Sequence, residues 1–416
     1  MARQESPPQR RISIFDATLR DGEQAPGNAM TTEQKKVLAL RAEAYGADTI
    51  EAGFPGSSPE DFAATRLVAE SLAPTTRFAT FNRASREDVR LSMEAGGARP
   101  NHQVQICGTG SDLHLRYKRG ISRQEAVRET GDAIRYAHSL GAQDVSFGVE
   151  DASRGEKDLI EALVTEALAA GVSTVILADT TGCATPQEYG DLCAMVRSWL
   201  PDDITLATHC HDDLGLSLAN ALAGIQAGAN EVQATLAGIG ERAGNTPLEE
   251  IAATLAYKGE QFGATTGIRL DHLYGAFQEL ATVISMPAPR NKAIFGDNAF
   301  ATEAGIHQDG ILKNPATYEF INPYRFARQR SLLVGRHSGR AVFRHVLQQL
   351  GMEPDDALVE RLYTEYVTER PDGRCDELDV VRDRLAAEFG PPGGDHGPSD
   401  RTAAGAGTPT GEENHG

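Results

Sequence analysis

The sequence has no excess of positive charge: 59 acidic residues stand against 40 Lys and Arg, for a formal net charge of −19. A chain this acidic is not expected to bind nucleic acid in general or to attach to an anionic membrane surface. A small anionic molecule is still compatible with it, because a single site can be locally basic. We therefore predict small-molecule partners, with no nucleic acid and no membrane.

Long apolar runs and paired cysteines are also missing. No run approaches the ~20 apolar residues that span a bilayer, and the segment Met1–Arg11 has no apolar signal-peptide core. The five cysteines include no C-x-x-C pair, and their odd number fits no complete set of disulfides. These features favour reduced thiols and predict a cytoplasmic protein.

Two terminal segments lack the apolar residues of a core, and the chain between them shows a repeated alternation. Composition predicts disorder for residues 1–9 and 390–416. From residue 10 to 275, β-rich apolar runs alternate with amphipathic helical stretches. The predicted strands are Ile12–Leu19, Thr49–Phe54, Arg77–Asn82, Gln103–Gly108, Asp144–Glu150, Thr174–Asp179, Thr205–His211 and Glu231–Leu236.

The number of these units predicts the fold class. Eight β–α units over about 250 residues are typical of a TIM (β/α)₈ barrel. A doubly wound open sheet is the main alternative, because both folds share the βαβ unit. The alternation stops near residue 275, and we predict a mainly helical C-terminal region over residues 276–389.

The strongest chemical signal is His209-Cys210-His211 at the end of the seventh predicted strand. Residues i and i+2 of a strand point to the same side, so the two imidazoles project together. Two imidazoles at the C-terminal end of a barrel strand can form half of a metal site. An H-x-H pattern considered alone is often an accident of sequence.

The other half of a metal site lies elsewhere in the chain. Asp21 follows the first predicted strand and Asn245 follows the eighth, and both strands become neighbours of the seventh when a barrel closes. Two imidazoles, a carboxylate and an amide oxygen suit Mg²⁺, Mn²⁺ or Zn²⁺ with positions left open for substrate. For each residue considered alone, the simpler interpretation is a turn cap for Asp21 and a loop residue for Asn245. Their convergence favours a metal site.

Four stretches resemble the isopropylmalate synthase and homocitrate synthase family: FDATLRDGEQAPG, THCHDDLGLSLANALAGIQAGA, GIGERAGNTPLEE and GIHQDGILKN. The resemblance runs from about Ile12 to Leu350. It implies an acyltransferase that condenses acetyl-CoA with a 2-oxo acid to give a 2-substituted malate. It also implies a divalent metal (Mn²⁺, Mg²⁺, Co²⁺ or Zn²⁺) that chelates the oxo acid, held by Asp21, His209, His211 and Asn245.

The resemblance assigns further roles within the barrel. Arg20 matches an arginine that stabilises charge developing on oxygen atoms, and Glu150 matches a glutamate near the substrate. Thr180 is expected to hydrogen-bond the substrate carboxylate, and His114 matches a pocket histidine.

Two more residues of the resemblance lie beyond the barrel. His307 and Tyr318 are expected to reach the barrel of a neighbouring subunit in a homodimer and to take part in acid–base steps. A structural surface histidine is the alternative for His307, and the surrounding GIHQDG favours function.

Departures from the family pattern concern the substrate. Gly148 removes a side chain and is expected to open space beside the metal, while Asn82, Arg83 and Arg116 add polarity near the pocket. We therefore expect an anionic oxo acid: phosphinopyruvate or phosphonopyruvate, as in the phosphinomethylmalate synthase branch of antibiotic biosynthesis, or 2-oxoglutarate, which gives homocitrate. Oxaloacetate is a further possibility. If Arg83 and Arg116 face solvent, the alternative is a 2-isopropylmalate synthase that acts on 2-oxoisovalerate.

Two other classes of function stay open. Acyl-CoA lyases and aldolases share the barrel and the H-x-H pattern, but GIGERAGN and the region around His307 favour the synthases. A binding protein without catalysis is the third class, and the complete set of candidate residues argues against it.

Overall fold

The computed structural model describes residues 9–370 and 373–389, so the expected disorder of residues 1–8 and 390–416 falls outside the described part of the chain. The chain divides into two compact units. The first comprises Met1–Ala301 and Glu319–Arg330, and the second comprises Thr302–Tyr318 and Ser331–Gly416. The expected boundary at residue 275 falls inside helix α11 (Leu270–Val283), so the first unit continues beyond it.

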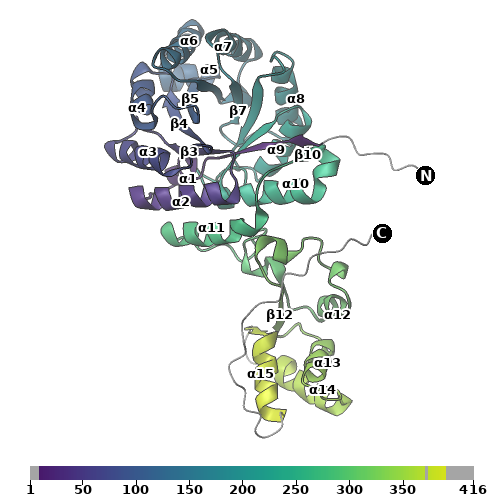
Figure 1. The fold of residues 1–416 in the computed structure, drawn as a ribbon. Coiled ribbons are helices and arrows are strands. Elements are labelled where there is room, and N and C mark those ends of the chain that lie inside the picture. Colours follow the sequence, from purple (N-terminus) through teal and green to yellow (C-terminus); the bar gives the residue numbers. More distant parts are fainter. Residues whose placement is uncertain (1–8, 371–372, 390–416) are drawn as a thin grey trace, which may run out of the picture. The chain divides into compact units, whose positions relative to one another are not determined.

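The first unit contains a closed barrel of eight parallel strands (Figure 1). The first and last strands pair directly, with Ser13 opposite Glu231, and this closure excludes the doubly wound sheet. The predicted TIM barrel is thus confirmed, and each predicted strand overlaps an observed one. The barrel strands are β2 (Ser13–Asp16), β3 (Thr49–Gly53), β4 (Arg77–Arg83), β5 (His102–Thr109), β6 (Asp144–Glu150), β7 (Thr174–Asp179), β8 (Thr205–Cys210) and β9 (Glu231–Ala234).

Alternation along the strands separates an apolar outer face from a largely polar interior. On β5, Val104 and Ile106 are fully buried in the core against the surrounding helices. Their neighbours Gln105, Cys107 and Thr109 point the opposite way and line a pocket. Side chains at i and i+2 share a face, so the inward positions of the strands decide what the interior can do.

Helices surround the barrel, and their ends follow local capping rules. Helix α2 begins after Thr31, whose hydroxyl accepts from the Gln34 amide in a capping box, and it ends at Gly46 in the left-handed conformation. The surrounding helices are α2 (Thr32–Tyr45), α3 (Pro59–Ser71), α4 (Arg86–Gly96), α6 (Arg123–Ser139), α7 (Lys157–Ala170), α8 (Pro186–Arg197), α9 (Ser217–Gln226) and α10 (Leu248–Phe262). No described helix has the length and apolar character needed to cross a membrane.

The second unit is mainly helical, as expected, with its own core around Phe343, Leu362 and Leu385. Its helices are α12 (Gly305–Lys313), α13 (Arg340–Gln349), α14 (Asp356–Tyr363) and α15 (Leu378–Phe389). A small sheet of β11 (Ala301–Thr302), β12 (Ser331–Val334) and β13 (Asp376–Glu377) was not predicted.

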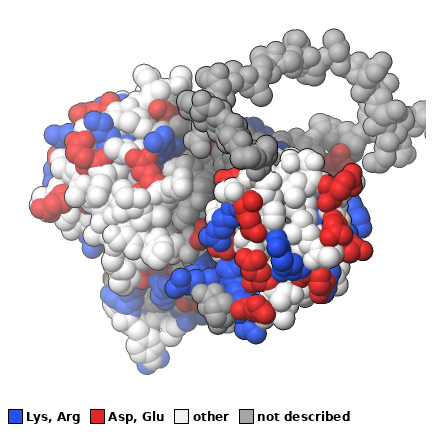
Figure 2. All heavy atoms as spheres, turned by 90° about the horizontal axis from the view of Figure 1, so that it is seen from below, with Lys and Arg blue, Asp and Glu red and all other residues white. Residues whose placement is uncertain are grey.

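Surface charge in the second unit is arranged as pairs between helices. Arg340 of α13 meets Glu360 of α14 at 2.6 Å, and Arg361 of α14 meets Glu388 of α15 at 3.3 Å. Figure 2 shows acidic and basic side chains interspersed on the visible face of the molecule.

Candidate active site

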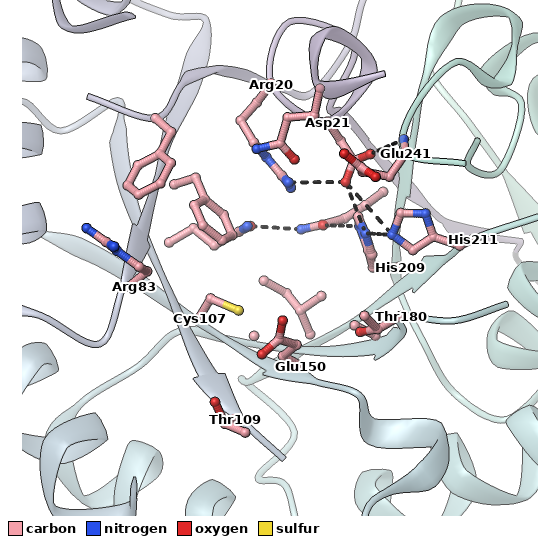
Figure 3. A pocket seen from close by; sticks show the side chains of 18 of the residues that line it. Arg20, Asp21, Arg83, Cys107, Thr109, Glu150, Thr180, His209, His211 and Glu241 are labelled. Carbon is pink, nitrogen blue, oxygen red and sulfur yellow. Dashed lines mark hydrogen bonds and ion pairs between the residues drawn. The ribbon is translucent and has the colours of Figure 1, made fainter. Parts of the chain in front are cut away.

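Three predicted ligands converge at the C-terminal ends of the barrel strands. Among the described residues, Asp21, His209 and His211 bring one ligand atom each within 4.8 Å of one another. The two Nε2 atoms are 3.3 Å apart, and Asp21 Oδ2 lies 3.6 Å from that of His209 and 3.9 Å from that of His211. Figure 3 shows the three side chains pointing toward one another at one end of the pocket.

The hydrogen bonds of the two imidazoles determine which nitrogens face this point. His211 Nδ1 contacts the carbonyl oxygen of Gly244 at 3.2 Å, and a carbonyl can only accept. His209 Nδ1 contacts Gln233 Oε1 at 3.0 Å, which is also an acceptor. Both Nδ1 atoms therefore carry the proton, and both Nε2 lone pairs point at each other and at a carboxylate. Three converging acceptors need a cation between them, and second-shell acceptors on Nδ1 are typical of metal-bound histidine.

The charge states fit the same conclusion. Burial, reinforced by neighbouring His211, lowers the pKa of His209 to about 3, and burial also lowers the pKa of His211. Burial alone would raise the pKa of Asp21, but the charge of Arg20 and, to a lesser extent, the hydrogen bond from Asn245 hold the pKa well below its usual range. Two neutral imidazoles and an ionised carboxylate are the protonation states that metal ligands need.

Asn245 adds an oxygen beside this group. A backbone bridge pairs it with His211, and its Nδ2 donates to Asp21 Oδ1 at 2.8 Å. Its own Oδ1 is buried and has no hydrogen-bond partner among the described residues. The loop before it approaches so closely that a Cβ on Gly240 would lie 2.1 Å from Asn245 Nδ2. The mixed nitrogen and oxygen donor set suits a divalent cation with open coordination positions.

Arg20 is held rigidly beside the ligands. Its Nη1 lies 3.1 Å from Asp21 Oδ2, its Nε lies 2.8 Å from Glu51 Oε2, and the guanidinium stacks 4.5 Å from the ring centre of Phe81. The side chain is 8% exposed and still lines the pocket. It can therefore present a preorganised positive charge to a bound oxyanion.

A buried polar chain was missed in the sequence. Gln105 Nε2 donates to Glu51 Oε1 at 3.2 Å, and Gln233 Nε2 donates to Gln105 Oε1 at 2.9 Å. Gln233 then meets His209, so four strands connect Arg20 to a candidate ligand. Burial raises the pKa of Glu51 to about 7, although Arg20 favours its ionised form. The sequence signal that could have revealed this chain was the presence of polar residues at inward-facing positions of the predicted strands.

The pocket has a volume of about 720 Å³. Gly148 lies on its wall, and a Cβ added there would meet nothing closer than 3.9 Å, so this glycine does leave space. The wall of the pocket includes the apolar and weakly polar residues Phe54, Phe81, Ala84, Cys107, Gly148, Ile176 and Ala178.

The structure does not bring Asn82 into the pocket. Its amide donates to the backbone carbonyl of Gln105 at 3.1 Å, and its Oδ1 accepts from the Ser92 hydroxyl at 2.6 Å. It faces helix α4 because Phe81 and Arg83, its neighbours on β4, take the inward positions. The expectation that Asn82 binds substrate is therefore corrected.

Two arginines expected near the substrate have other surroundings. Arg83 lines the pocket, but its side chain is 65% exposed and forms a bidentate pair with Asp88 at 2.7 and 2.9 Å. In Figure 3 it lies across the pocket from the candidate ligands. Arg116 is exposed, stacks on Tyr117 and does not line the pocket. Lys118, two residues later, does line it.

Glu150 and Thr180 line the pocket, whereas His114 does not. Glu150 Oε1 meets Lys118 Nζ at 2.5 Å, and its Oε2 lies 3.5 Å from His114 Nδ1. Thr180 Oγ1 accepts from the backbone amide of Asp151 at 2.8 Å. His114 Nε2 lies 3.6 Å from Asp151 Oδ2 and 3.4 Å from Arg154 Nη2, so its neighbours are these side chains and Glu150.

His307 and Tyr318 lie in the second unit and face each other. Their ring centres are 4.2 Å apart, and Tyr318 is 49% exposed. The exposed neighbour Ile306 is 80% accessible. Their part in catalysis stays a proposal.

The fold and site define a TIM-barrel protein with a histidine–carboxylate centre suited to a divalent metal. Two family models match the chain: HMGL-like over residues 11–279 and Homocitrate synthase post-HMGL domain-like over residues 294–370. The 2-isopropylmalate synthase of Shouchella clausii is 40% identical over 359 residues, which cover 86% of this chain and 70% of that protein. The chloroplastic 2-isopropylmalate synthase 2 of Arabidopsis thaliana is 37% identical and is covered over 58% of its length. The chain belongs to the isopropylmalate synthase and homocitrate synthase family.

Solved structures agree on the fold. The hydroxymethylglutaryl-CoA lyase of Pseudomonas aeruginosa has a TM-score of 0.58 at 21% identity, over 67% of this chain and 94% of that one. The HMG-CoA lyase of Brucella melitensis gives the same TM-score at 20% identity.

Proposed function

We propose that this chain condenses acetyl-CoA and a 2-oxo acid, with water, to a 2-substituted malate and free CoA. The observation that carries the proposal is the convergence of Asp21 Oδ2 with the Nε2 lone pairs of His209 and His211 beside Arg20. The relatives named 2-isopropylmalate synthase support the same reaction class.

The proposed ligands are Asp21, His209, His211 and Asn245. A divalent cation bound there would act as a Lewis acid on the keto group of the oxo acid. Arg20 would donate to oxygen atoms that gain negative charge as the new carbon–carbon bond forms. Thr180 would contact the substrate carboxylate.

Acetyl-CoA must lose a methyl proton before that bond forms. Glu150 is a carboxylate of the pocket wall, and we assign it to this proton transfer, with Lys118 paired to its Oε1 and His114 Nδ1 lying 3.5 Å from its Oε2. His307 and Tyr318 are the proposed acid–base pair of the second unit, acting on the barrel of a partner in a homodimer. Mixing His307→Ala subunits with Arg20→Ala subunits tests this. We expect activity to return after subunit exchange, and no recovery would assign each site to its own chain.

The pocket wall favours a compact apolar substituent on the oxo acid, such as that of 2-oxoisovalerate. Two of the polar residues that suggested an anionic substituent, Asn82 and Arg116, do not line the pocket, and Arg83 is already paired with Asp88. Lys118 and Arg119 line the pocket and favour a second candidate, an anionic oxo acid whose tail would replace Glu150 as the partner of Lys118.

Release of free thiol from acetyl-CoA, measured with separate 2-oxo acids, tests both the condensation reaction and the identity of the oxo acid. We expect thiol release that depends on an oxo acid and on metal, with the highest kcat/KM for 2-oxoisovalerate. A higher kcat/KM for 2-oxoglutarate, oxaloacetate or phosphonopyruvate would select the anionic candidate. No thiol release with any oxo acid, in metal-loaded protein, would refute the condensation.

A further inference from the structure

The buried chain that starts at Glu51 has a direction. The Arg20 guanidinium 2.8 Å away favours the ionised form of Glu51, and an ionised carboxylate can only accept hydrogen bonds, so Gln105 turns its NH₂ group toward Glu51. Gln105 Oε1 then faces Gln233, which must also turn its NH₂ group toward it. The remaining atom, Gln233 Oε1, faces His209 Nδ1 and accepts its proton. Each amide has one orientation that satisfies both neighbours.

Burial prevents the members of this chain from exchanging their hydrogen-bond partners. Glu51, Gln105 and Gln233 are 0%, 4% and 2% exposed, so solvent does not offer them substitute partners. A buried polar group that loses its partner costs about 1–3 kcal/mol, and an amide chain avoids this cost by turning every member together. Arg20 fixes the charge of the first member, because its Nε lies 2.8 Å from Glu51 Oε2 and this ion pair favours the carboxylate over the neutral acid.

We propose that Glu51, acting through Gln105 and Gln233, holds His209 in the Nδ1-protonated tautomer and so keeps its Nε2 lone pair aimed at Asp21 and His211. Glu51 is thus a positioning residue that never touches the candidate ligands. This inference rests on the proposed metal site.

A single isosteric change reverses the chain. In Glu51→Gln, the carbonyl oxygen stays toward Arg20, and the new NH₂ group faces Gln105. Gln105 and Gln233 must both turn over, and Gln233 then offers an NH₂ group to His209 Nδ1. That nitrogen must accept, so the proton moves to Nε2 and blocks the ligand atom.

A second change restores the direction without restoring the original carboxylate. In Glu51→Gln with Gln233→Glu, the turned Gln105 donates to the carboxylate at position 233, and that carboxylate also accepts from His209 Nδ1. The number of buried carboxylates is unchanged, while Arg20 still lacks the carboxylate at position 51 and keeps only its ion pair with Asp21. A role of Glu51 limited to Arg20 would therefore not be rescued.

The matched control is Glu231→Gln. Glu231 is another buried carboxylate of the barrel interior, on the same strand as Gln233, and its Oε1 has no hydrogen-bond partner among the described residues. The substitution is the same in size and charge, and it leaves the chain intact.

The experiment measures the Kd for Mn²⁺ by electron paramagnetic resonance on metal-depleted protein. We expect a rise of about 10–100-fold in Glu51→Gln, the usual effect of losing a second-shell partner. We expect recovery to within about threefold of wild type in the double variant and no comparable change in Glu231→Gln. Unchanged affinity in Glu51→Gln, or failure of the double variant to recover, would overturn the inference.

Histidine ¹⁵N shifts of the metal-free protein give a second readout that does not depend on metal binding. We expect His209 to be Nδ1-protonated in wild type and Nε2-protonated in Glu51→Gln. The same tautomer in both would refute the chain. Absence of Mn²⁺ binding in wild type would instead refute the proposed metal site, so the two failures are distinguishable. If Glu51→Gln does not fold, Gln105→Met interrupts the chain with no change of charge, and an unaltered His209 tautomer there would equally count against us.

Discussion

Glu51 and Glu231 are both fully buried in the interior of the same barrel, and burial raises the pKa of each to about 7. Glu51 lies within β3 and has two partners, Arg20 at 2.8 Å and Gln105 at 3.2 Å. Glu231 begins β9, and its Oε1 has no hydrogen-bond partner among the described residues. Two residues with the same chemistry and burial therefore occupy very different environments.

The same contrast extends to their surroundings. Toward the C-terminal ends of the strands, inward polar groups join a chain that reaches the candidate ligands. Nearer the N-terminal ends, Thr49, Gln103 and Ser146 have buried side-chain oxygens without hydrogen-bond partners among residues 9–370 and 373–389. TIM barrels place their chemistry at the C-terminal face. Glu51 Oε2 and Asn245 Oδ1 also lack hydrogen-bond partners among the described residues, so the two ends differ in connection and not in full satisfaction: the polar groups at the C-terminal end form a chain to the candidate ligands.

The largest expected effect comes from removing the divalent metal from the proposed site at the C-terminal end of the barrel. Extensive chelation should abolish thiol release, and Mn²⁺, Mg²⁺ or Co²⁺ should restore it, because the proposed Lewis acid is lost and regained. His211→Ala should lose metal and activity together, as measured by elemental analysis and turnover. Full turnover in protein shown to contain no metal would contradict the proposed centre.

Arg20→Lys should cost about 10²–10³ in kcat, the usual effect of losing one oxyanion donor. An ammonium cannot reproduce the planar contacts of Arg20 with Asp21, Glu51 and Phe81. Arg83→Lys is the control, because Arg83 is exposed and lies on the far side of the pocket in Figure 3. Equal losses in both variants would mean that Arg20 has no special role.

Gly148→Ala should change selectivity more than it changes stability. Its Cβ would project into space beside the pocket, so the oxo acids with the bulkiest substituents should lose about 10-fold in kcat/KM relative to pyruvate, as methyl-sized differences usually do. Gly275→Ala, where a Cβ also meets open space, lies outside the lining and serves as the control. A uniform loss across all oxo acids would argue against Gly148 as a specificity residue.

The smallest expected effect concerns Glu231 and is a pH-dependent change in the free energy of unfolding. Its folded pKa of about 7 exceeds the ordinary 4.5, so the native state binds more protons than the unfolded state between these pH values. Stability should therefore fall as pH rises through this window. Glu231→Gln should be more stable than wild type at pH 8 by roughly 1–3 kcal/mol and nearly equal at pH 4, measured by denaturant unfolding. A variant less stable than wild type at pH 8 would show that the carboxylate has a favourable partner.

Local patterns were sufficient for the barrel and for half of the site. Apolar runs act over a few residues, so the strands were predicted closely. His209 and His211 were paired correctly because a strand repeats every two residues. Asn82 was misplaced because the same rule does not say which of two alternating faces is the inner one, and Phe81 and Arg83 occupy that face here.

The sequence by itself determined the alternating elements, the i and i+2 histidines and the family motifs, because each depends on neighbours in the chain. Only the closed barrel decided that Glu51, Gln105 and Gln233 meet, since they lie on three strands separated by 54 and 128 residues. Strand register and closure set those contacts, and hydrogen bonds between distant strands leave no local periodicity. Which ring nitrogen of His209 carries the proton therefore depends on the tertiary structure. Each buried amide of the chain has one orientation that satisfies its hydrogen bonds.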